Sequence, residues 1–268
     1  MLKTEMRNEK TTNIDKMSTY EMLKIINEEN YNAVKAVEEA IPQIEDVCEA
    51  VVRAFKAGGR LFYIGCGTSG RMGVVDAAEC PPTFGVPSDM VVGIIAGGLP
   101  SMAKPTESKE DDEESGINDI KQYNLTKEDI VIGISVAGGA KYVIGALKYA
   151  SQIGCVTAGI TSNKDSLLDK VADYSIVTDT GAEVVTGSTR MKAGTAQKIV
   201  LNMISTISMI KMGNVYQNLM INLRPQNIKL KKRMISIVSE ILDCDFEKAE
   251  QLLEKNDWKI RDCVENKD

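Results

Sequence analysis

The sequence predicts an α/β fold, in which helices cover both faces of one parallel sheet. Short apolar runs recur through the middle of the chain, helical patterns separate most of them, and glycines bound the first run. Such runs are typical of strands buried on both faces, and their alternation with helices is typical of βαβ units. The predicted strands are 61–64, 90–96, 130–135, 155–161 and 174–178.

Helices are predicted before the first strand. Residues 1–17 show no clear periodicity, and Ser18 with Glu21 then forms a capping-box pattern that starts a helix through about residue 28. A second helical stretch covers about 30–56 and is interrupted at Pro42. We therefore expect an N-terminal helical segment over residues 1–56.

Helices are also predicted after the fifth strand. A long helix covers about 190–212 and is closed by Gly213, and another begins after Arg224-Pro225, where proline suits a first turn. The tail, 242–268, has the pattern of two short amphipathic helices. The prediction is an α/β domain over 57–222 and a small C-terminal helical subdomain over 223–268.

Composition excludes several classes of function. The chain has 268 residues, a net charge of −6 and a pI near 5.0, which argues against nucleic acid as a partner. The N-terminus is polar, and the most apolar stretch, 199–210, is interrupted by Asn202 and is too short to span a bilayer. Six cysteines form no CxxC pair. We expect a cytoplasmic protein with reduced thiols and no contact with a membrane.

Histidine is absent from the chain. Proton transfer near neutral pH must then fall to other side chains or to water, and carboxylates are the leading candidates. The lack of imidazole ligands also argues against a catalytic zinc or iron site. We expect neither a metal nor a cofactor.

A glycine-rich loop follows the first predicted strand. Residues 65–71 read GCGTSGR and match the pattern G-x-G-x-x-G, but the next strand ends in IAGG without the acidic residue that would hold a dinucleotide ribose. Thr68 and Ser69 instead supply hydroxyls at a helix N-terminus, which suits a single phosphate group. The alternative is a purely structural strand-to-helix turn.

Three further features are ambiguous from the residues alone. Glu79 precedes two prolines that should end its helix, so it is either functional or an ordinary surface carboxylate. Glu110 lies in the acidic run 107–114, which equally suits a solvated first turn of a helix. Residues 183–192 place hydroxyl groups before the long helix and form either a second anion site or that helix's N-cap.

Several longer strings resemble the N-acetylmuramic acid 6-phosphate etherase family. They are GTSGRMGVVDAAECPPTFGV at 67–86, IAGG at 95–98, ESKEDDEESG at 107–116 and EVVTGSTRMKAGTAQKIVLNMIST at 183–206. The resemblance extends over almost the whole chain. It implies a sugar isomerase (SIS) domain, a homodimer with its sites at the subunit interface and no metal. The implied reaction cleaves the lactyl ether of N-acetylmuramate 6-phosphate, giving N-acetylglucosamine 6-phosphate and D-lactate.

The resemblance also assigns roles to residues. It implies that Glu110 is the base that removes the proton at C2, and that Glu79 is the acid that protonates the departing lactate. We expect burial behind Pro81, Pro82 and Phe84 to keep that acid protonated. The residues implied in binding the sugar phosphate are Gly67, Thr68, Ser69, Gly70, Arg71, Ser135, Gly138, Glu183, Ser188 and Thr189.

Geometry favours a site shared by two subunits. On a regular helix Glu79 lies about 13 Å beyond Gly70 along the axis, which is far from a sugar held by the phosphate loop of the same chain. A site that combines Glu79 of one subunit with the phosphate loop of the other would not have to bridge this distance.

One segment departs from the family pattern. Family members usually have Ser-x-Ser-Gly-Arg-Thr-Pro after the third strand, whereas residues 135–141 read SVAGGAK and keep only the first serine and the glycine. Lys141 could replace part of the lost charge. Two alternatives therefore stay open: a sugar-phosphate-binding regulator similar to the glucokinase regulatory proteins, and a SIS enzyme acting on another phosphosugar, such as an aldose-ketose isomerase, although the latter gives no reason for the AECPP segment.

Overall fold

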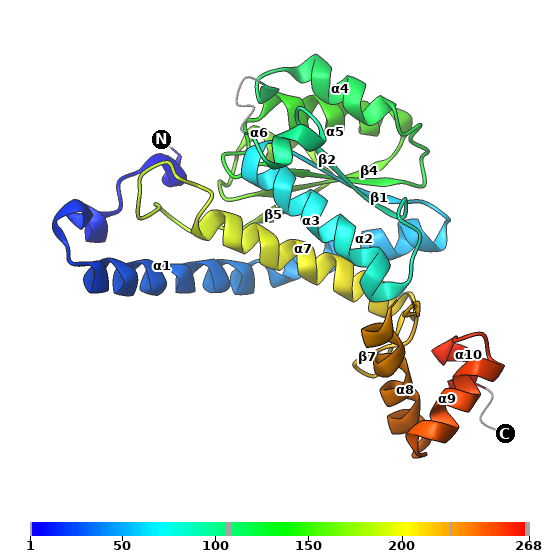
Figure 1. Ribbon diagram of the computed structural model, residues 1–268. Coiled ribbons are helices and arrows are strands. Elements are labelled where there is room, and N and C mark those ends of the chain that lie inside the picture. Colours follow the sequence, from blue (N-terminus) through cyan, green and yellow to red (C-terminus); the bar gives the residue numbers. More distant parts are fainter. Residues whose placement is uncertain (1, 105–108, 226, 266–268) are drawn as a thin grey trace.

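A parallel sheet with the strand order β2-β1-β3-β4-β5 forms the centre of the protein (Figure 1). The computed structural model describes residues 2–104, 109–225 and 227–265. All five predicted strands are confirmed, with small differences at their ends. Their bounds are β1 Leu61–Gly65, β2 Val91–Ile95, β3 Ile130–Ile134, β4 Val156–Thr161 and β5 Tyr174–Val177.

Helices cover both faces of the sheet, as the sequence predicts (Figure 1). One face carries α2 (Ile41–Lys56), α3 (Gly67–Phe84) and α7 (Lys192–Lys211), and the other carries α4 (Glu113–Lys121), α5 (Lys141–Ile153) and α6 (Leu167–Val171). Successive residues of β1 enter different cores: Tyr63 packs with the first group, whereas Phe62 and Ile64 pack with the second. This alternation explains why every residue of β1 is apolar or glycine.

The N-terminal segment consists of short turns and one long helix. The turns are η1 (Lys3–Glu5), η2 (Glu9–Thr11) and η3 (Ile14–Lys16), and α1 spans Thr19–Glu39. The predicted capping box is confirmed, since the backbone N–H of Glu21 donates to Ser18 Oγ and the N–H of Ser18 donates to the Glu21 carboxylate. The predicted end near residue 28 is wrong, because neither glycine nor proline interrupts the helix before Ala40.

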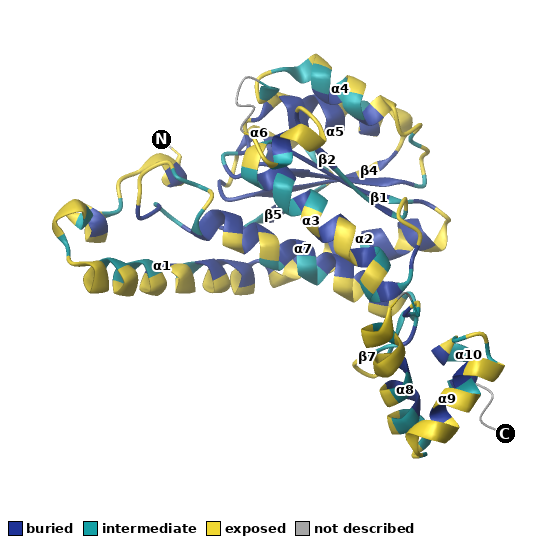
Figure 2. Ribbon diagram, in the orientation of Figure 1, coloured by how far each residue is buried: buried dark blue, intermediate teal, exposed yellow. Residues whose placement is uncertain are grey.

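The helix α1 projects beyond the sheet and runs beside α7 (Figure 1). Figure 2 shows buried residues on its side toward α7 and exposed residues on its outer side. Pro42 lies in the first turn of α2, where its missing N–H costs no helical hydrogen bond. The interruption predicted at Pro42 is therefore found, as a break at Ala40 between α1 and α2.

The helix α3 does not end at its two prolines, contrary to the prediction. Pro81 and Pro82 lie within it, and it continues to Phe84. Gly85 ends it in the left-handed conformation (φ 67°), and its N–H donates to the carbonyl oxygen of Pro81. A Cβ at this position would also lie 2.0 Å from the carbonyl oxygen of Asn222, so only glycine fits.

The C-terminal part forms a separate apolar cluster. It contains a short hairpin and three helices: β6 Val215–Tyr216, β7 Leu219–Met220, α8 Ile228–Leu242, α9 Phe246–Lys255 and α10 Ile260–Glu265. Pro225 precedes α8 and is not in its first turn, because Asn227 caps that helix. No helix in the described part of the chain is long and apolar enough to cross a membrane.

Candidate functional site

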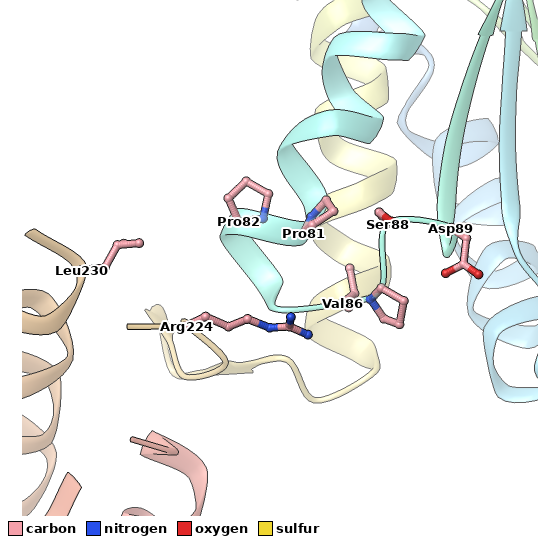
Figure 3. A pocket seen from close by; sticks show the side chains of 8 residues that line it. Pro81, Pro82, Val86, Ser88, Asp89, Arg224 and Leu230 are labelled. Carbon is pink, nitrogen blue, oxygen red and sulfur yellow. The ribbon is translucent and has the colours of Figure 1, made fainter. Parts of the chain in front are cut away.

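A hollow of about 640 Å³ lies where the C-terminal end of α3 approaches α8 (Figure 3). Its lining includes Pro81, Pro82, Asp89 and Arg224. Neither Glu79 nor Glu110 lines it, and neither does any residue predicted to bind phosphate. Its size alone therefore does not make it the candidate site.

A smaller pocket, of about 160 Å³, lies at the carboxyl ends of β1 and β3. These strands are neighbours, but β1 leads into α3 on one face of the sheet and β3 into α5 on the other. Ligands of open α/β sheets bind in the crevice at this kind of topological switch point. The pocket brings together six of the predicted residues. Its lining consists of Cys66, Gly67, Thr68, Ser69, Glu110, Ile134, Ser135, Val136, Ala137 and Thr189.

The N-terminus of α3 opens into this pocket. The first residue, Gly67, has a left-handed φ of 50°, and the side chain of the N-cap residue Cys66 makes no capping hydrogen bond. Helical bonding begins with the N–H of Gly70, which donates to the carbonyl oxygen of Cys66. The N–H groups of residues 67–69 and the positive end of the helix dipole are thus available to an anion.

Gly70 has a structural role and does not line the pocket. A Cβ there would lie 2.5 Å from the carbonyl oxygen of Gly65, so glycine lets α3 begin directly against the end of β1. Arg71 also points elsewhere, because its guanidinium donates to the carbonyl oxygens of Ser101 and Met102 in η4 (Leu99–Met102). The direct contacts expected of these two residues are not found in the single chain.

The N-terminus of α7 is already occupied. The carboxylate of buried Glu183 accepts hydrogen bonds from the backbone N–H groups of Lys192 (3.3 Å) and Ala193 (2.9 Å). Burial raises the pKa of Glu183, and these hydrogen bonds oppose the shift. Glu183 thus bonds the first N–H groups of α7, whereas no hydroxyl group of 183–192 caps the helix: its N-cap residue is Met191, whose side chain makes no capping hydrogen bond. Glu183 and Ser188 do not line the pocket, whereas Thr189 does.

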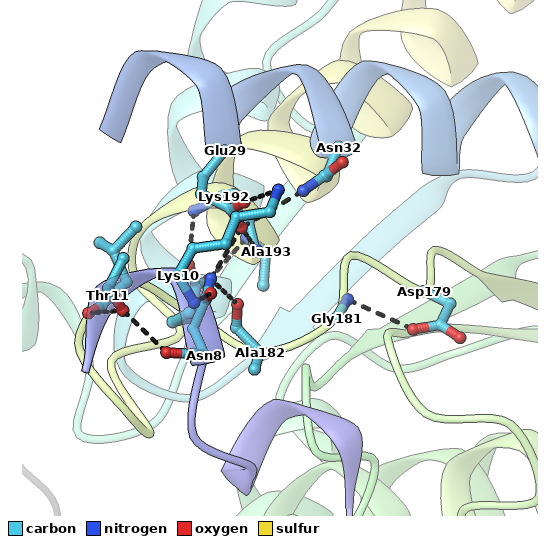
Figure 4. A network of polar contacts seen from close by, with 12 residues as sticks. Asn8, Lys10, Thr11, Glu29, Asn32, Asp179, Gly181, Ala182, Lys192 and Ala193 are labelled. Atoms are coloured by element: carbon cyan, nitrogen blue, oxygen red, sulfur yellow. Dashed lines mark hydrogen bonds and ion pairs between the residues drawn. The ribbon is translucent and has the colours of Figure 1, made fainter. Parts of the chain in front are cut away.

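A buried ion pair holds the segment before α7 in place. Lys192 Nζ lies 2.5 Å from Glu29, which also accepts hydrogen bonds from Lys10 and Asn8 (Figure 4). Burial alone would raise the pKa of Glu29, but the hydrogen bonds from Lys192 and Lys10 lower it to about 2. This network joins the N-terminal turns, α1 and α7, and so fixes the loop that carries Thr189.

Glu110 lies at the rim of the pocket. Its backbone carbonyl accepts a hydrogen bond from the N–H of Tyr142 (3.0 Å), which fixes its position over the start of α5. Partial loss of hydration, and then repulsion from Asp111, raises the pKa of the Glu110 carboxyl group. A carboxylate with a raised pKa is a stronger base, which suits proton abstraction. Residues 107 and 108 of the acidic run lie outside the described residues.

The thiol of Cys66 lines the same pocket, although no pattern in the sequence singled it out. Burial, together with the charge of Glu110, raises its pKa to about 12. Cys66 is therefore a neutral thiol near pH 7 and not a nucleophile. Within the described residues no cluster of acidic or cysteine side chains could hold a metal ion.

Glu79 lies away from the pocket. It is twelve residues beyond Gly67 on α3, or about 18 Å along the axis, and it is exposed. The expected burial behind the two prolines and Phe84 is wrong for the single chain, because Phe84 turns into the core. Exposed Val75, Ala78 and Pro82 surround Glu79 on this side of α3.

The segment after β3 retains part of the expected site. Ser135 is buried in the pocket wall, and the N–H of Gly138 donates to its hydroxyl oxygen at 3.1 Å. Gly138 has a left-handed φ of 72° and does not line the pocket itself. Lys141 lies 3.9 Å from Asp111 and is also outside the lining. The turn thus positions Ser135, whereas Lys141 does not supply the lost charge within the single chain.

Comparison with known domains defines the class of protein. The SIS domain model matches residues 114–207, and the model of the glucokinase regulatory protein N-terminal SIS domain matches residues 43–151. The solved structure of the E. coli CFT073 protein c3406 has a TM-score of 0.55 and 19% identity, covering 75% of this chain and 97% of that one. A phosphoheptose isomerase from Francisella tularensis has a TM-score of 0.51 and 17% identity, covering 73% and 100%. The chain therefore has the SIS fold.

More similar relatives identify the family. A relative from Halalkalibacterium halodurans, named N-acetylmuramic acid 6-phosphate etherase, is 51% identical over 94% of this chain and 85% of its own length. Relatives with the same name from Clostridium beijerinckii and Bacillus mycoides are 50% and 49% identical, covering 97% and 98% of this chain and 86% and 90% of their own lengths. The chain belongs to the N-acetylmuramic acid 6-phosphate etherase family.

Proposed function

We propose that this protein is a carbon–oxygen lyase that cleaves the D-lactyl ether of N-acetylmuramic acid 6-phosphate during recycling of cell-wall sugar in the cytoplasm. The supporting observation is that Glu110, with its raised pKa, lines the same pocket as the open N-terminus of α3. The start of α3 and a candidate base therefore line one small space. A phosphosugar is a ligand with both a phosphate and an acidic carbon-bound proton.

The phosphate binds at the start of α3. The backbone N–H groups of residues 67–69 face it, with the hydroxyl groups of Thr68, Ser69 and Ser135 around it. Thr189 closes the pocket from the segment before α7. This arrangement needs none of the residues that the segment 135–141 lacks, although fewer contacts should make binding weaker than in relatives with the full pattern.

The reaction is an elimination followed by addition of water. In the open-chain sugar the aldehyde acidifies the proton at C2, and the Glu110 carboxylate removes it. The electrons form a C2–C3 double bond as the C3–O bond to lactate breaks, and a carboxylic acid protonates the departing oxygen. Water then adds at C3, C2 regains a proton, and the products are N-acetylglucosamine 6-phosphate and D-lactate.

The second carboxyl group comes from Glu79 of another copy of the chain. One copy cannot bring its own Glu79 to its pocket, because α3 separates them by about 18 Å. The apolar residues around Glu79 are exposed, and the outer face of α1 also exposes large apolar side chains: Tyr20 (76%), Leu23 (63%), Tyr31 (70%) and Val34 (57%). A partner covering these surfaces would exclude water from Glu79. The active form is therefore a homodimer.

Incubation with N-acetylmuramic acid 6-phosphate in deuterated water tests the reaction. We expect release of D-lactate together with deuterium at C2 of the product, because C2 is reprotonated from solvent. Lactate without deuterium at C2 would refute the elimination. Binding of the sugar phosphate with neither lactate nor exchange would instead favour a non-catalytic regulator, and exchange at C2 without lactate would favour a SIS enzyme on another phosphosugar.

A further inference from the structure

The backbone carbonyl group of Val136, which lines the pocket at the carboxyl ends of β1 and β3, is held by three donors. They are the backbone N–H of Ser162 (2.9 Å), the hydroxyl group of Thr161 (3.1 Å) and Nδ2 of Asn163 (2.9 Å). All three come from the end of β4 or the loop after it. A carbonyl oxygen has two lone pairs, so three donors saturate it and fix its direction, toward that loop.

The partners of Asn163 fix which end of its amide faces Val136. Oδ1 accepts a hydrogen bond from the backbone N–H of Lys3 (3.1 Å), and a backbone N–H can only donate. Nδ2 donates to Thr4 Oγ1 (3.1 Å) and to the Val136 carbonyl oxygen, and a carbonyl oxygen can only accept. Asn163 is 6% exposed and Thr4 is buried. The N-terminal turn η1 is therefore tied, through one buried amide, to the wall of the pocket.

The direction of the Val136 carbonyl group also fixes the N–H that follows it. In a trans peptide the carbonyl group and the next N–H point in opposite directions, and the described chain contains no cis peptide bond. The N–H of Ala137 therefore points away from the loop after β4. Ala137 lines the pocket, and no acceptor for its N–H is found among the described residues. Ala137 also stands where the family pattern has its second serine.

We propose that Asn163 is a positioning residue, which holds the Val136 carbonyl group so that the Ala137 N–H donates to a phosphate bound in the pocket. Thr161 has the same role. Neither Asn163 nor Thr161 lines the pocket, so neither contacts the phosphate itself. The inference deepens the proposed function, since it rests on the phosphate site proposed there. It does not depend on the elimination chemistry.

The amide resonance of Ala137 tests the direction of its N–H. In protein labelled with ¹⁵N-alanine, a correlation spectrum shows each alanine N–H, and the signal missing from Ala137→Gly identifies this one. We expect inorganic phosphate to move the Ala137 amide proton downfield, because a hydrogen bond to a charged oxygen deshields the proton. If calorimetry shows phosphate bound while the Ala137 resonance stays unchanged, the proposal is wrong.

Titration calorimetry with inorganic phosphate tests the role of the two side chains. Thr161→Val with Asn163→Leu keeps the side-chain volumes similar but leaves the Val136 carbonyl group one of its three donors. We expect phosphate affinity to fall about 10-fold, at the lower end of the loss expected for one hydrogen bond to a charged group. The peptide then no longer holds its direction, and its carbonyl oxygen can turn toward the anion. Thr161→Ser keeps the hydroxyl donor and should bind phosphate like the wild type.

Thr157→Val is the matched control for packing. Thr157 is also buried on β4, but it lies near the opposite end of the strand and donates to Asp173 at 2.8 Å. Its loss should lower the unfolding temperature without changing phosphate affinity. Thermal unfolding shows whether the double variant is folded during the titration. Wild-type phosphate affinity in the folded double variant would overturn the proposal, and if that variant does not fold, the Ala137 resonance of the wild type decides.

The two proposals fail in distinguishable ways. If phosphate moves the Ala137 resonance and the variants behave as expected, but no lactate is released from N-acetylmuramic acid 6-phosphate, only the reaction is refuted. If lactate is released but bound phosphate leaves the Ala137 resonance unchanged, only the role of Asn163 is refuted. If the wild type binds neither inorganic phosphate nor the sugar phosphate, the anion site is refuted, and the role of Asn163 with it.

Discussion

Lys192 and Glu29 are 163 residues apart in the sequence, and their side chains meet at 2.5 Å in a buried ion pair. The lysine begins α7 and the glutamate lies in the middle of α1, so the pair fastens the N-terminal helix to the segment that carries Thr189. The side chains are only 2% and 5% exposed, so each charge depends on the other for neutralisation.

Glu29→Gln should destabilise the fold strongly. The change removes the carboxylate that pairs directly with the buried Lys192 ammonium group, and loss of one partner of a buried pair costs about 3–5 kcal/mol. Chemical denaturation measures this as a lower free energy of unfolding. The neighbouring change Glu28→Gln is the control, because Glu28 and Lys24 form an exposed pair at 3.9 Å and its loss should cost less than about 1 kcal/mol. Equal effects of the two changes would contradict the assigned role.

The same pair predicts a dependence of stability on acid. The pKa of Glu29 is about 2 in the folded chain and near 4.5 when unfolded, so its stabilising contribution is complete above pH 4.5 and is lost as the pH falls from 4.5 toward 2. Glu183 and Asp76 have raised pKa values in the folded chain, so a fall in pH changes their contributions to folding stability in the opposite direction, in favour of the folded state. The difference in unfolding free energy between wild type and Glu29→Gln isolates the effect. That difference should shrink over this interval, and a constant difference would refute the shift.

Glu110→Gln should slow lactate release and exchange at C2 about 10²- to 10⁴-fold, while phosphate binding is retained. The amide cannot accept a proton from carbon, and a loss of this size is typical when a general base is removed. In the wild type the base works only when ionised, so activity should fall with acid through a pKa above the usual 4.5 of a glutamate. An acid limb at or below 4.5 would show that another group is the base.

A mixture of two inactive variants tests whether the site is shared. Glu79→Gln and Glu110→Gln should each be inactive. If each site takes one carboxyl group from each copy, a mixed dimer contains one intact site, and re-equilibrated equimolar variants should recover about a quarter of wild-type activity. No recovery, despite exchange of subunits seen with differently tagged chains, would mean that both glutamates act within one copy.

The local features of this fold could be predicted from the sequence. The five strands follow from apolar runs bounded by turns, and the capping box at Ser18 follows from residues three positions apart. The glycine loop predicted that Thr68 and Ser69 lie at a helix N-terminus, and in the structure both line a pocket there. The specific strings around Glu79 and Thr189 predicted the family, which the relatives confirm. Each of these signals is contained within a few residues or one string.

Other features were decided by packing between distant segments. Where the sequence suggested the end of α1, nothing stopped the helix, and α1 could continue along α7 to Ala40. Residues 183–192 could have formed a second anion site or the N-cap of α7, and only the tertiary structure shows that the Glu183 carboxylate accepts hydrogen bonds from the N–H groups of Lys192 and Ala193. The exposure of Glu79 likewise depends on which elements pack over the end of α3.

The sequence by itself determined the order of strands and helices, the glycine loop and the family, because backbone propensity and hydrophobic periodicity act over short stretches of chain. Only the tertiary structure decided that Gln197 meets Ser69 across 128 residues and that Lys192 is neutralised by Glu29. Such contacts depend on how the sheet order places α3, α1 and α7 side by side. A polar residue within a helix carries no local sign of the partner that it will find there.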